Sequence, residues 1–288
     1  MTARGAARAA RHRAGRIGSA LAAATAATLL LPTGAETPVA EAAARAAFFL
    51  SGGVPGESFG CSVAGAGDVN GDGYGDVIVG AYQSGPVGQP VGRAYIYFGG
   101  LRPQNRPDVI LSGEAVGDAF GVCVAPAGDM NKDGYADVIV GAYHNGAGGK
   151  DAGRAYVYYG GAAPSERPAL VLTGEAAGDA FGYSVSGAGD VNGDGFGDVA
   201  VGAYGNDAGG SAAGRAYLFF GGGADVVPDF IQTGEATLDN LGFAVSGAGD
   251  VDGDGTADLV VGAPYSDGEA GRAYLSRAIA KARRIVQR

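Results

Sequence analysis

Short apolar runs, separated by glycine and acidic residues, recur along the chain between residues 48 and 276. The runs are rich in Val, Ile, Tyr and Phe, and Gly, Asp and Pro bound them. Such runs are typical of short β-strands joined by tight turns. Apolar residues do not follow the spacing of a helix over any useful length of this region. The pattern therefore predicts an all-β protein.

The runs form a repeat that occurs four times, about 60 residues apart. Phe59-Gly60 recurs as Phe120-Gly121 and Phe181-Gly182, and then as Leu241-Gly242. The full repeat unit contains four runs, which predicts a four-stranded antiparallel sheet. Such a sheet cannot bury both of its faces alone, so it must stack on other copies. Radial stacking gives a β-propeller of four blades, and a solenoid with two coils per repeat is the alternative.

The two ends of the repeat region complement each other. The first copy is preceded by FFLSG (residues 48–52), which matches the outer strand VILSG of a later repeat. The fourth copy ends after Arg272, Ala273 and Tyr274 and lacks that strand. We therefore expect the N-terminal strand to complete the last blade and close the ring. The alternative is that the chain represents one section of a longer array.

An acidic loop of nine residues follows the first strand of each copy. The loops are DVNGDGYGD from Asp68, DMNKDGYAD from Asp129, DVNGDGFGD from Asp190 and DVDGDGTAD from Asp250. Asp or Asn occupies positions 1, 3, 5 and 9, and Gly occupies position 6, where it permits a sharp turn. A loop that coils around a hard cation presents alternate oxygens to it, as Ca²⁺ requires. Transition metals favour His and Cys, and Mg²⁺ demands stricter geometry, so the loops predict up to four Ca²⁺ ions.

The predicted ligands of each ion are the side chains at positions 1, 3, 5 and 9 and the backbone carbonyl at position 7. They are Asp68, Asn70, Asp72, Tyr74, Asp76, Asp129, Asn131, Asp133, Tyr135, Asp137, Asp190, Asn192, Asp194, Phe196, Asp198, Asp250, Asp252, Asp254, Thr256 and Asp258. An EF-hand would need Glu at position 12 and flanking helices, whereas this position is Val79 in the first loop. Asx-rich loops also form ordinary turns, but four copies at a fixed spacing favour metal sites. The ions are expected to be structural rather than catalytic.

Two further features of the repeats point to packing and to binding. Arg93, Arg154, Arg215 and Arg272 open the third strand of each copy, and an ion pair or carbonyl contact between blades is favoured over a ring of ligand-binding arginines. The loops between the second and third strands vary most, and they share the face opposite the acidic loops. Variation on a rigid scaffold most often carries binding. His144 lies in one of these loops, where a lone histidine is expected to be solvated.

The repeats resemble the FG-GAP repeats of the integrin alpha-chain propeller, which also occur in glycosylphosphatidylinositol-specific phospholipase D and in many bacterial surface proteins. The Phe-Gly pairs supply the first half of the motif, and Gly262-Ala263-Pro264 supplies the second. The resemblance covers about 230 residues. It implies calcium in the loop between the first two strands of each blade. Because integrin propellers have seven blades, it also allows these four to be part of a larger seven-bladed type.

The N-terminal segment has the layout of a secretory signal peptide, because an arginine-rich start precedes the apolar run of residues 17–31 and a stretch of small residues. The run is shorter than the roughly 20 residues of a membrane span. We therefore predict a signal peptide (1–35), a linker (36–47), the propeller repeats (48–276) and a basic C-terminal tail (277–288). The protein is expected to be secreted or held at the cell surface, with no membrane span after signal cleavage.

The net charge of −10 argues against a nucleic-acid partner and for cations. The sequence predicts a calcium-binding adhesion or protein-interaction module with a protein or glycan ligand outside the cell, and not an enzyme. A lectin-like carbohydrate binder is the alternative, although the chain has no Trp to stack on sugars. A calcium-dependent polysaccharide lyase or phospholipase relative ranks third, because the histidine-rich metal domain of such a phospholipase is lacking. Whether the chain forms an oligomer is left open.

Overall fold

The computed structural model describes residues 49–86, 88–224 and 226–277, which belong to one compact unit, Phe48–Arg288. The predicted signal peptide and linker lie outside the described residues, as does the predicted C-terminal tail except for Arg277. The only helix in the described ranges, α1 (Ser266–Glu269), is a single distorted turn. No helix in these ranges has both the length and the apolar character that a membrane crossing requires.

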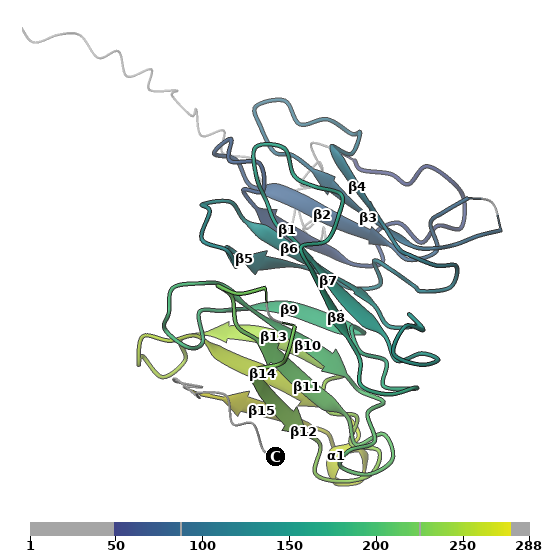
Figure 1. Ribbon diagram of the computed structural model, residues 1–288, viewed down its shortest axis with the longest axis vertical. Coiled ribbons are helices and arrows are strands. Elements are labelled where there is room, and N and C mark those ends of the chain that lie inside the picture. Colours follow the sequence, from purple (N-terminus) through teal and green to yellow (C-terminus); the bar gives the residue numbers. More distant parts are fainter. Residues whose placement is uncertain (1–48, 87, 225, 278–288) are drawn as a thin grey trace, which may run out of the picture. The chain divides into compact units, whose positions relative to one another are not determined.

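The described residues form four antiparallel sheets, one for each repeat (Figure 1). Three sheets have four strands in chain order, and the last has three, which confirms an all-β propeller of four blades. The first two blades consist of β1 (Val63–Gly67), β2 (Asp76–Ala81), β3 (Arg93–Tyr97), β4 (Val109–Ser112), and of β5 (Val124–Gly128), β6 (Asp137–Ala142), β7 (Arg154–Tyr158), β8 (Leu170–Thr173). The last two consist of β9 (Ser184–Gly189), β10 (Asp198–Ala203), β11 (Arg215–Phe219), β12 (Phe230–Thr233), and of β13 (Ala244–Gly249), β14 (Asp258–Ala263), β15 (Arg272–Ser276).

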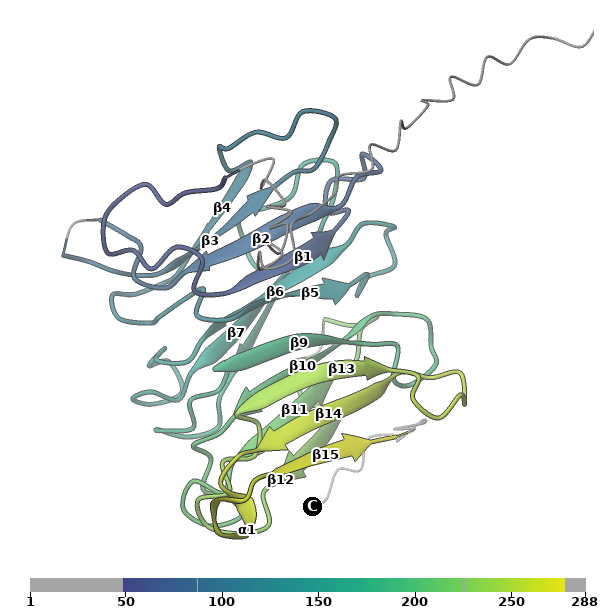
Figure 2. The same ribbon diagram turned by 180° about the vertical axis from the view of Figure 1, so that it is seen from behind.

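The hydrophobic cores lie between successive blades. Figure 2 shows the inner strands β1, β5, β9 and β13 one after another, and each pair of neighbouring blades shares a core cluster. Strand β6 is buried along its whole length, since Val138 and Val140 face the first blade while Ile139 faces the third. The second strand of a middle blade is covered by a neighbouring blade on each face, so nearly all of its residues are apolar. This explains the run DVIVGA.

The Phe-Gly pair of each blade is part of the joint with the preceding blade. Phe120 and Phe181 are buried in the shared cores, and each packs edge-on against a tyrosine of its own blade. The glycine that follows lies directly against a glycine of the preceding blade, so a Cβ atom there would collide with a carbonyl oxygen. The three pairs are Gly80 with Gly121, Gly141 with Gly182, and Gly202 with Gly242. The two halves of the repeat motif therefore meet across the boundary between blades.

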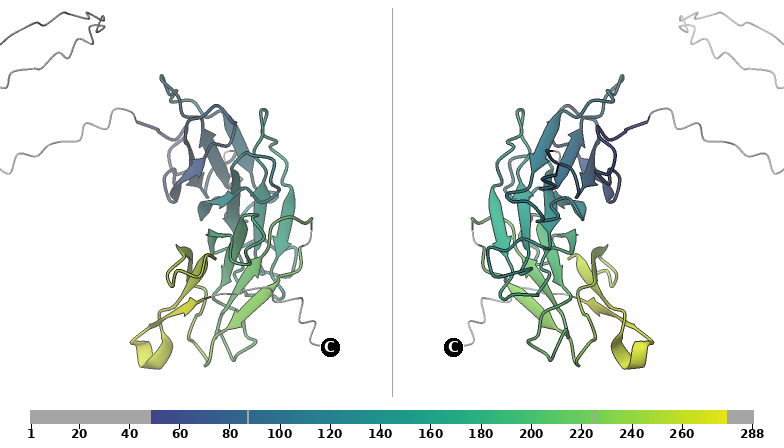
Figure 3. Two further views of the ribbon diagram at one scale, coloured as in Figure 1. Left: turned by 90° about the vertical axis from the view of Figure 1, so that its left-hand side faces the viewer. Right: turned by 90° about the vertical axis from the view of Figure 1, so that its right-hand side faces the viewer.

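Residues 49–51 do not complete the last blade, so the expectation that they close the ring is wrong for the described residues. Leu50 packs against the first blade, beside Val79 and Tyr97, where it covers apolar surface that a preceding blade would bury. Strand β15 has β14 as its only strand partner in the described part of the chain. No core cluster of the described ranges combines the first blade with the fourth, and Figure 3 shows the two middle blades between them.

Candidate metal centre

Each acidic loop starts at a bulge near the end of the first strand of its blade. The strand register shifts there in all four sheets. The residue before each loop is a glycine with φ between 68° and 80°, a left-handed conformation that glycine adopts without strain. These glycines are Gly67, Gly128, Gly189 and Gly249. The bulge turns the chain out of the sheet, so that the aspartate at position 1 begins the loop.

Backbone N–H groups hold the first three acidic positions on the inside of the loop. In the first loop, the Asp68 carboxylate accepts hydrogen bonds from the N–H groups of Gly71 at 2.7 Å and Gly73 at 2.8 Å. The side-chain oxygen of Asn70 accepts from the Asp72 N–H at 3.0 Å, and the Asp72 carboxylate accepts from the N–H at position 7 at 2.9 Å. The same bonds from the position-6 N–H to position 1 and from the position-7 N–H to position 5 recur in the other three loops.

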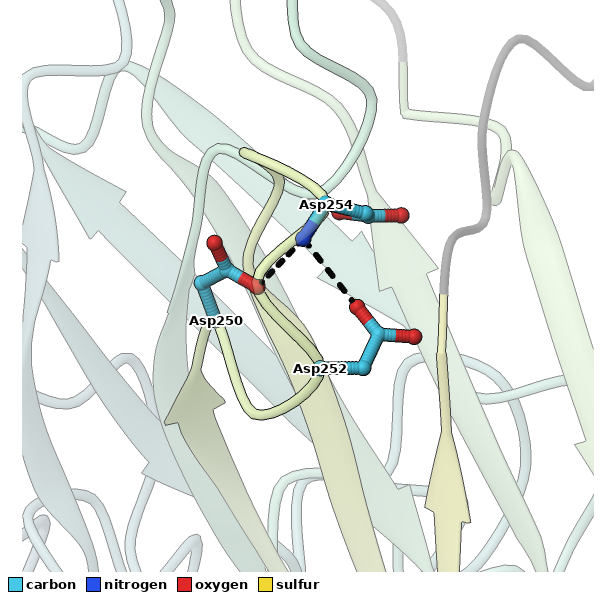
Figure 4. Close-up of side chains that lie close together, drawn as sticks. All are labelled: Asp250, Asp252 and Asp254. Carbon is cyan, nitrogen blue, oxygen red and sulfur yellow. Dashed lines mark hydrogen bonds between the residues drawn. The ribbon is translucent and has the colours of Figure 1, made fainter.

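The fourth loop brings three carboxylates together (Figure 4). Oxygen atoms of Asp250, Asp252 and Asp254 lie within 4.8 Å of one another, and all three residues are exposed. Like charges at this distance repel one another unless a cation compensates them. The first three loops have asparagine at position 3, so each combines two carboxylates with an amide oxygen there. Oxygen-only donor sets of this kind fit Ca²⁺.

The aspartate at position 9 differs from the other predicted ligands because it is buried. Asp137 accepts hydrogen bonds from the N–H groups of Met130 at 2.7 Å and Gly160 at 2.8 Å, so it ties the loop to the end of the third strand. Asp76 and Asp198 make the equivalent pairs of bonds, and Asp258 accepts from the Val251 N–H at 2.8 Å. Asp258 lies outside the cluster of three carboxylates.

Burial changes the ionisation of these carboxyl groups. It raises the pKa of Asp137 to about 6 and that of Asp198 to about 7, although the hydrogen bonds from backbone N–H groups act in the opposite direction. The carboxylates at positions 5 and 1 of each loop raise the pKa further by repulsion. A cation in the loop would counter both effects, because it favours the ionised form of its neighbours.

Neighbouring loops contact each other side by side. Position 7, predicted to offer its carbonyl, also places its side chain against the preceding loop: the Tyr135 ring lies next to Gly71. Lys132 extends to the following loop, where its ammonium group lies 4.5 Å from the centre of the Phe196 ring and donates to the Asp194 carbonyl at 3.0 Å. The sequence analysis did not anticipate this role, although Lys132 is the one residue other than glycine at position 4.

The loops also belong to the joints between blades. The carbonyl of Asp68 accepts a hydrogen bond from the Ala136 N–H at 2.9 Å, and the carbonyl of Val69 accepts from the Gly161 N–H at 2.8 Å. Both donors lie in the second blade. The second loop makes the same two bonds to the third blade, and the Asp190 carbonyl accepts from the fourth. Order in one loop is therefore coupled to the contact with the next blade.

The recurring arginines form ion pairs between blades, as predicted, in three of four cases. Arg154 pairs with Glu114 at 2.6 Å, Arg215 with Glu175 at 2.7 Å, and Arg272 with Glu235 at 2.8 Å. Each glutamate lies at the end of the preceding repeat. Arg93 has no such partner among the described residues, because Gly53 stands at the position of the glutamate. The favoured interpretation of these residues as structural is confirmed for the other three.

The opposite end of the blades carries an aromatic surface and a cavity. The rings of Tyr143, Tyr183, Tyr204 and Phe243 contact one another, with centroid distances from 4.7 to 5.7 Å. Tyr143 also lines a cavity of about 930 Å³ together with Glu57, Tyr82, Gln83 and His144. His144 is exposed, as expected for a solvated side chain, but its ring also stacks on Tyr143 and bonds to Asp151 at 2.9 Å.

Comparison with known proteins agrees with this architecture. The FG-GAP repeat family matches residues 59–97, 120–158, 181–219 and 241–276. Integrin alpha-IIb of Mus musculus is 39% identical over 156 residues, which is 51% of this chain and 15% of that protein. Integrin alpha-5 of Xenopus laevis is 36% identical over 166 residues, which is 53% of this chain and 15% of that protein. The match thus spans a small part of these relatives' length. The chain belongs to the FG-GAP repeat family.

Proposed function

We propose that this protein is a calcium-stabilised adhesion or protein-interaction module that acts outside the cell and is not an enzyme. One observation carries the proposal: loops of the same design lie side by side on consecutive blades, each with oxygen side chains on its inner side. The similarity to integrin alpha chains supports a role in adhesion, and the signal peptide predicted for residues 1–35 supports export.

The side chains at positions 1, 3 and 5 would hold each ion, with the carbonyl at position 7 and the carboxylate at position 9 as the remaining predicted ligands. The ion supplies positive charge that offsets the repulsion within the loop. A site of millimolar affinity contributes about 1 kcal/mol to folding when calcium is in several-fold excess. Four such sites would add a substantial part of the free energy of unfolding of an ordinary domain.

Thermal unfolding of the full chain with calcium and with chelator tests the metal. We expect calcium to raise the Tm by about 2 to 4 °C for each site occupied. Asp194→Asn, which removes an exposed carboxylate from the third loop, should reduce that rise. Asp207→Asn, on the opposite end of the same blade, is the matched control and should leave it unchanged. Equal Tm values with calcium and with chelator would show that the loops are plain turns.

The aromatic end of the blades is the proposed ligand-binding face. It lies away from the calcium loops, it is hollowed beside Tyr143, and residues of the first two variable loops line the cavity. Extracellular-matrix proteins and glycans, presented on two separate arrays, are suitable probes. A protein hit that weakens in Tyr143→Ser supports the interaction module.

The same cavity supports a lectin-like function as the second candidate, because tyrosine rings and polar groups line it together. Glycan hits that weaken in Tyr143→Ser, with no protein hits, would favour carbohydrate binding over protein binding. Arrays probed with Asp194→Asn show whether binding needs the calcium loops or only the aromatic end.

A further inference from the structure

The described residues of the fourth blade expose a surface that each earlier blade buries against the next blade. Ala94 and Ile96 of the first blade are buried in the core shared with the second blade. The equivalent residues of the fourth blade, Ala273 and Leu275, are exposed, Leu275 to 45%. Gly262 stands where Gly80, Gly141 and Gly202 abut the next blade, but a Cβ atom on it would meet no atom closer than 3.6 Å.

The first blade exposes the complementary surface, which each later blade buries against the blade before it. Val124 and Val138 of the second blade are almost fully buried against the first blade. Their equivalents in the first blade, Val63 and Val77, are 65% and 39% exposed. Gly60, the glycine of the first Phe-Gly pair, has no atom within 4 Å of an added Cβ, whereas each later glycine at this position lies against the preceding blade.

The residues just before the first blade match an outer strand, which the fourth blade lacks within the described part of the chain. Strand β4 pairs with β3 so that Leu111 lies opposite Ala94 and Ser112 opposite Arg93. By repeat equivalence, Leu50 and Ser51 would lie opposite Ala273 and Arg272 of β15. Leu50 precedes Phe59 by the same nine positions that separate Leu111 from Phe120. The connection therefore has the length that joins two consecutive blades elsewhere in the chain.

We propose that two copies of this chain associate head to tail, with residues 49–51 of one copy paired to β15 of the other. The first blade of the former then lies against the fourth blade of the latter, as each blade lies against the next within the chain. Gly60 of one copy would then lie against Gly262 of the other, and Val63 would pack against Leu275. The Gly75 N–H would donate to the Asp250 carbonyl, as the Ala136 N–H donates to the Asp68 carbonyl within the chain.

The partner is a second copy of this chain because the open face of the first blade complements the open face of the fourth blade. A joint between unlike surfaces either closes into a ring or continues as a fibre. Two copies of residues 49–277 supply eight blades, a number within the range of closed propellers, so the expected product is a closed dimer. The ion pair of the other joints would be missing, since Gly53 replaces the glutamate, but exposed pairs contribute little to stability.

Gly262→Ala tests the joint with little effect on the separate chain. Gly262 has no left-handed φ, and its Cβ would make only ordinary contacts in one copy, whereas in the dimer it would collide with the carbonyl of Gly60. Sedimentation velocity of the full chain over a range of concentrations gives the association constant. We expect a dimer for the native sequence and a dissociation constant at least about 10-fold higher for Gly262→Ala.

Two controls locate the contact. Gly146→Ala, an exposed loop glycine whose added Cβ would meet nothing closer than 3.9 Å, should dimerise as the native chain does. Hydrogen exchange should show β15 amides protected in the dimer and unprotected in Gly262→Ala. A native chain that stays monomeric at every concentration overturns the proposal. A dimer that Gly262→Ala leaves equally strong, with β15 unprotected in both, also overturns it.

Discussion

Residues of the same type have different roles within one acidic loop. The carboxylates at positions 1 and 5 are on the inside of an exposed loop, whereas the carboxylate at position 9 is buried and accepts two backbone N–H groups. The sequence predicted the loop and its oxygen donors from alternation alone. It could not show that the position-9 carboxylate also anchors the loop, because its burial depends on the end of the third strand, which is 23 residues away at Gly221.

Asp198→Asn should therefore destabilise the protein with or without calcium. One carboxylate oxygen becomes an amide N–H₂ that faces the N–H of Val191 or of Gly221, which leaves a buried donor unsatisfied. The expected loss is about 1 to 3 kcal/mol in the free energy of unfolding, measured with denaturant in chelator. Asp194→Asn is the comparison, and its destabilising effect should be larger with calcium than in chelator, because its carboxylate is exposed. A similar response from both variants would contradict the separation of roles.

The glycine contacts between blades give a second prediction for single residues. A Cβ on Gly202 would collide with the carbonyl of Gly242, and both belong to backbone that cannot move aside cheaply. We expect Gly202→Ala to lower the free energy of unfolding by about 1 to 3 kcal/mol. Gly146→Ala has open space and should stay within about 0.5 kcal/mol of the native chain. Equal stabilities of the two variants, from urea unfolding, would show that the blades can shift apart.

At the scale of elements, strand count and order followed from the repeat, and the three-stranded last sheet followed from the point where the pattern ends. The sequence did not place residues 49–51 correctly. They resemble an outer strand, but pairing with β15 within one chain would require the first and fourth blades to meet. Leu50 instead covers the open side of its own blade, beside Val79. The sequence of residues 49–51 predicts an outer strand, but it cannot show whether that strand lies at the first blade or at β15 of the fourth blade.

The ion pairs between elements should contribute little. Glu114 is about half exposed at its side chain, and Arg154 is about one fifth exposed, so water screens the attraction. A double-mutant cycle with Glu114→Gln and Arg154→Met, followed by urea unfolding, should give a coupling energy of at most about 1 kcal/mol. A coupling of several kcal/mol would mean that the pair, and not the glycine contact, holds neighbouring blades together.

At the scale of the whole molecule, the sequence predicted the propeller because four copies of one unit can bury their faces only by stacking. It did not predict that the shared cores would leave opposite faces of the first and fourth blades open. Whether these faces stay open depends on the number of blades that closes the ring. That number is set by the angle between neighbouring blades, which the sequence of a single repeat does not reveal.

A fragment of residues 48–112 should therefore not form a fixed tertiary structure. Ile78, Ala94 and Ile96 would lose the second blade against which they are buried. Near-ultraviolet circular dichroism should show no tyrosine signal from this fragment, whereas residues 48–233, with three blades, should show one. A folded single blade with protected amides would contradict the view that each core needs two blades.

The position of each core between two blades also sets an order for folding during synthesis. When only the first repeat has left the ribosome, the second blade, which supplies the other side of the first hydrophobic core, has not yet been made. Phe120, Val138 and Tyr156 complete that core, so the nascent chain must extend past them before the first blade has a stable surface. Every later repeat finds a folded neighbour waiting. Folding should thus begin only when the second repeat has been made, and each later repeat, such as the fourth with Leu241, can then pack directly against the blade before it.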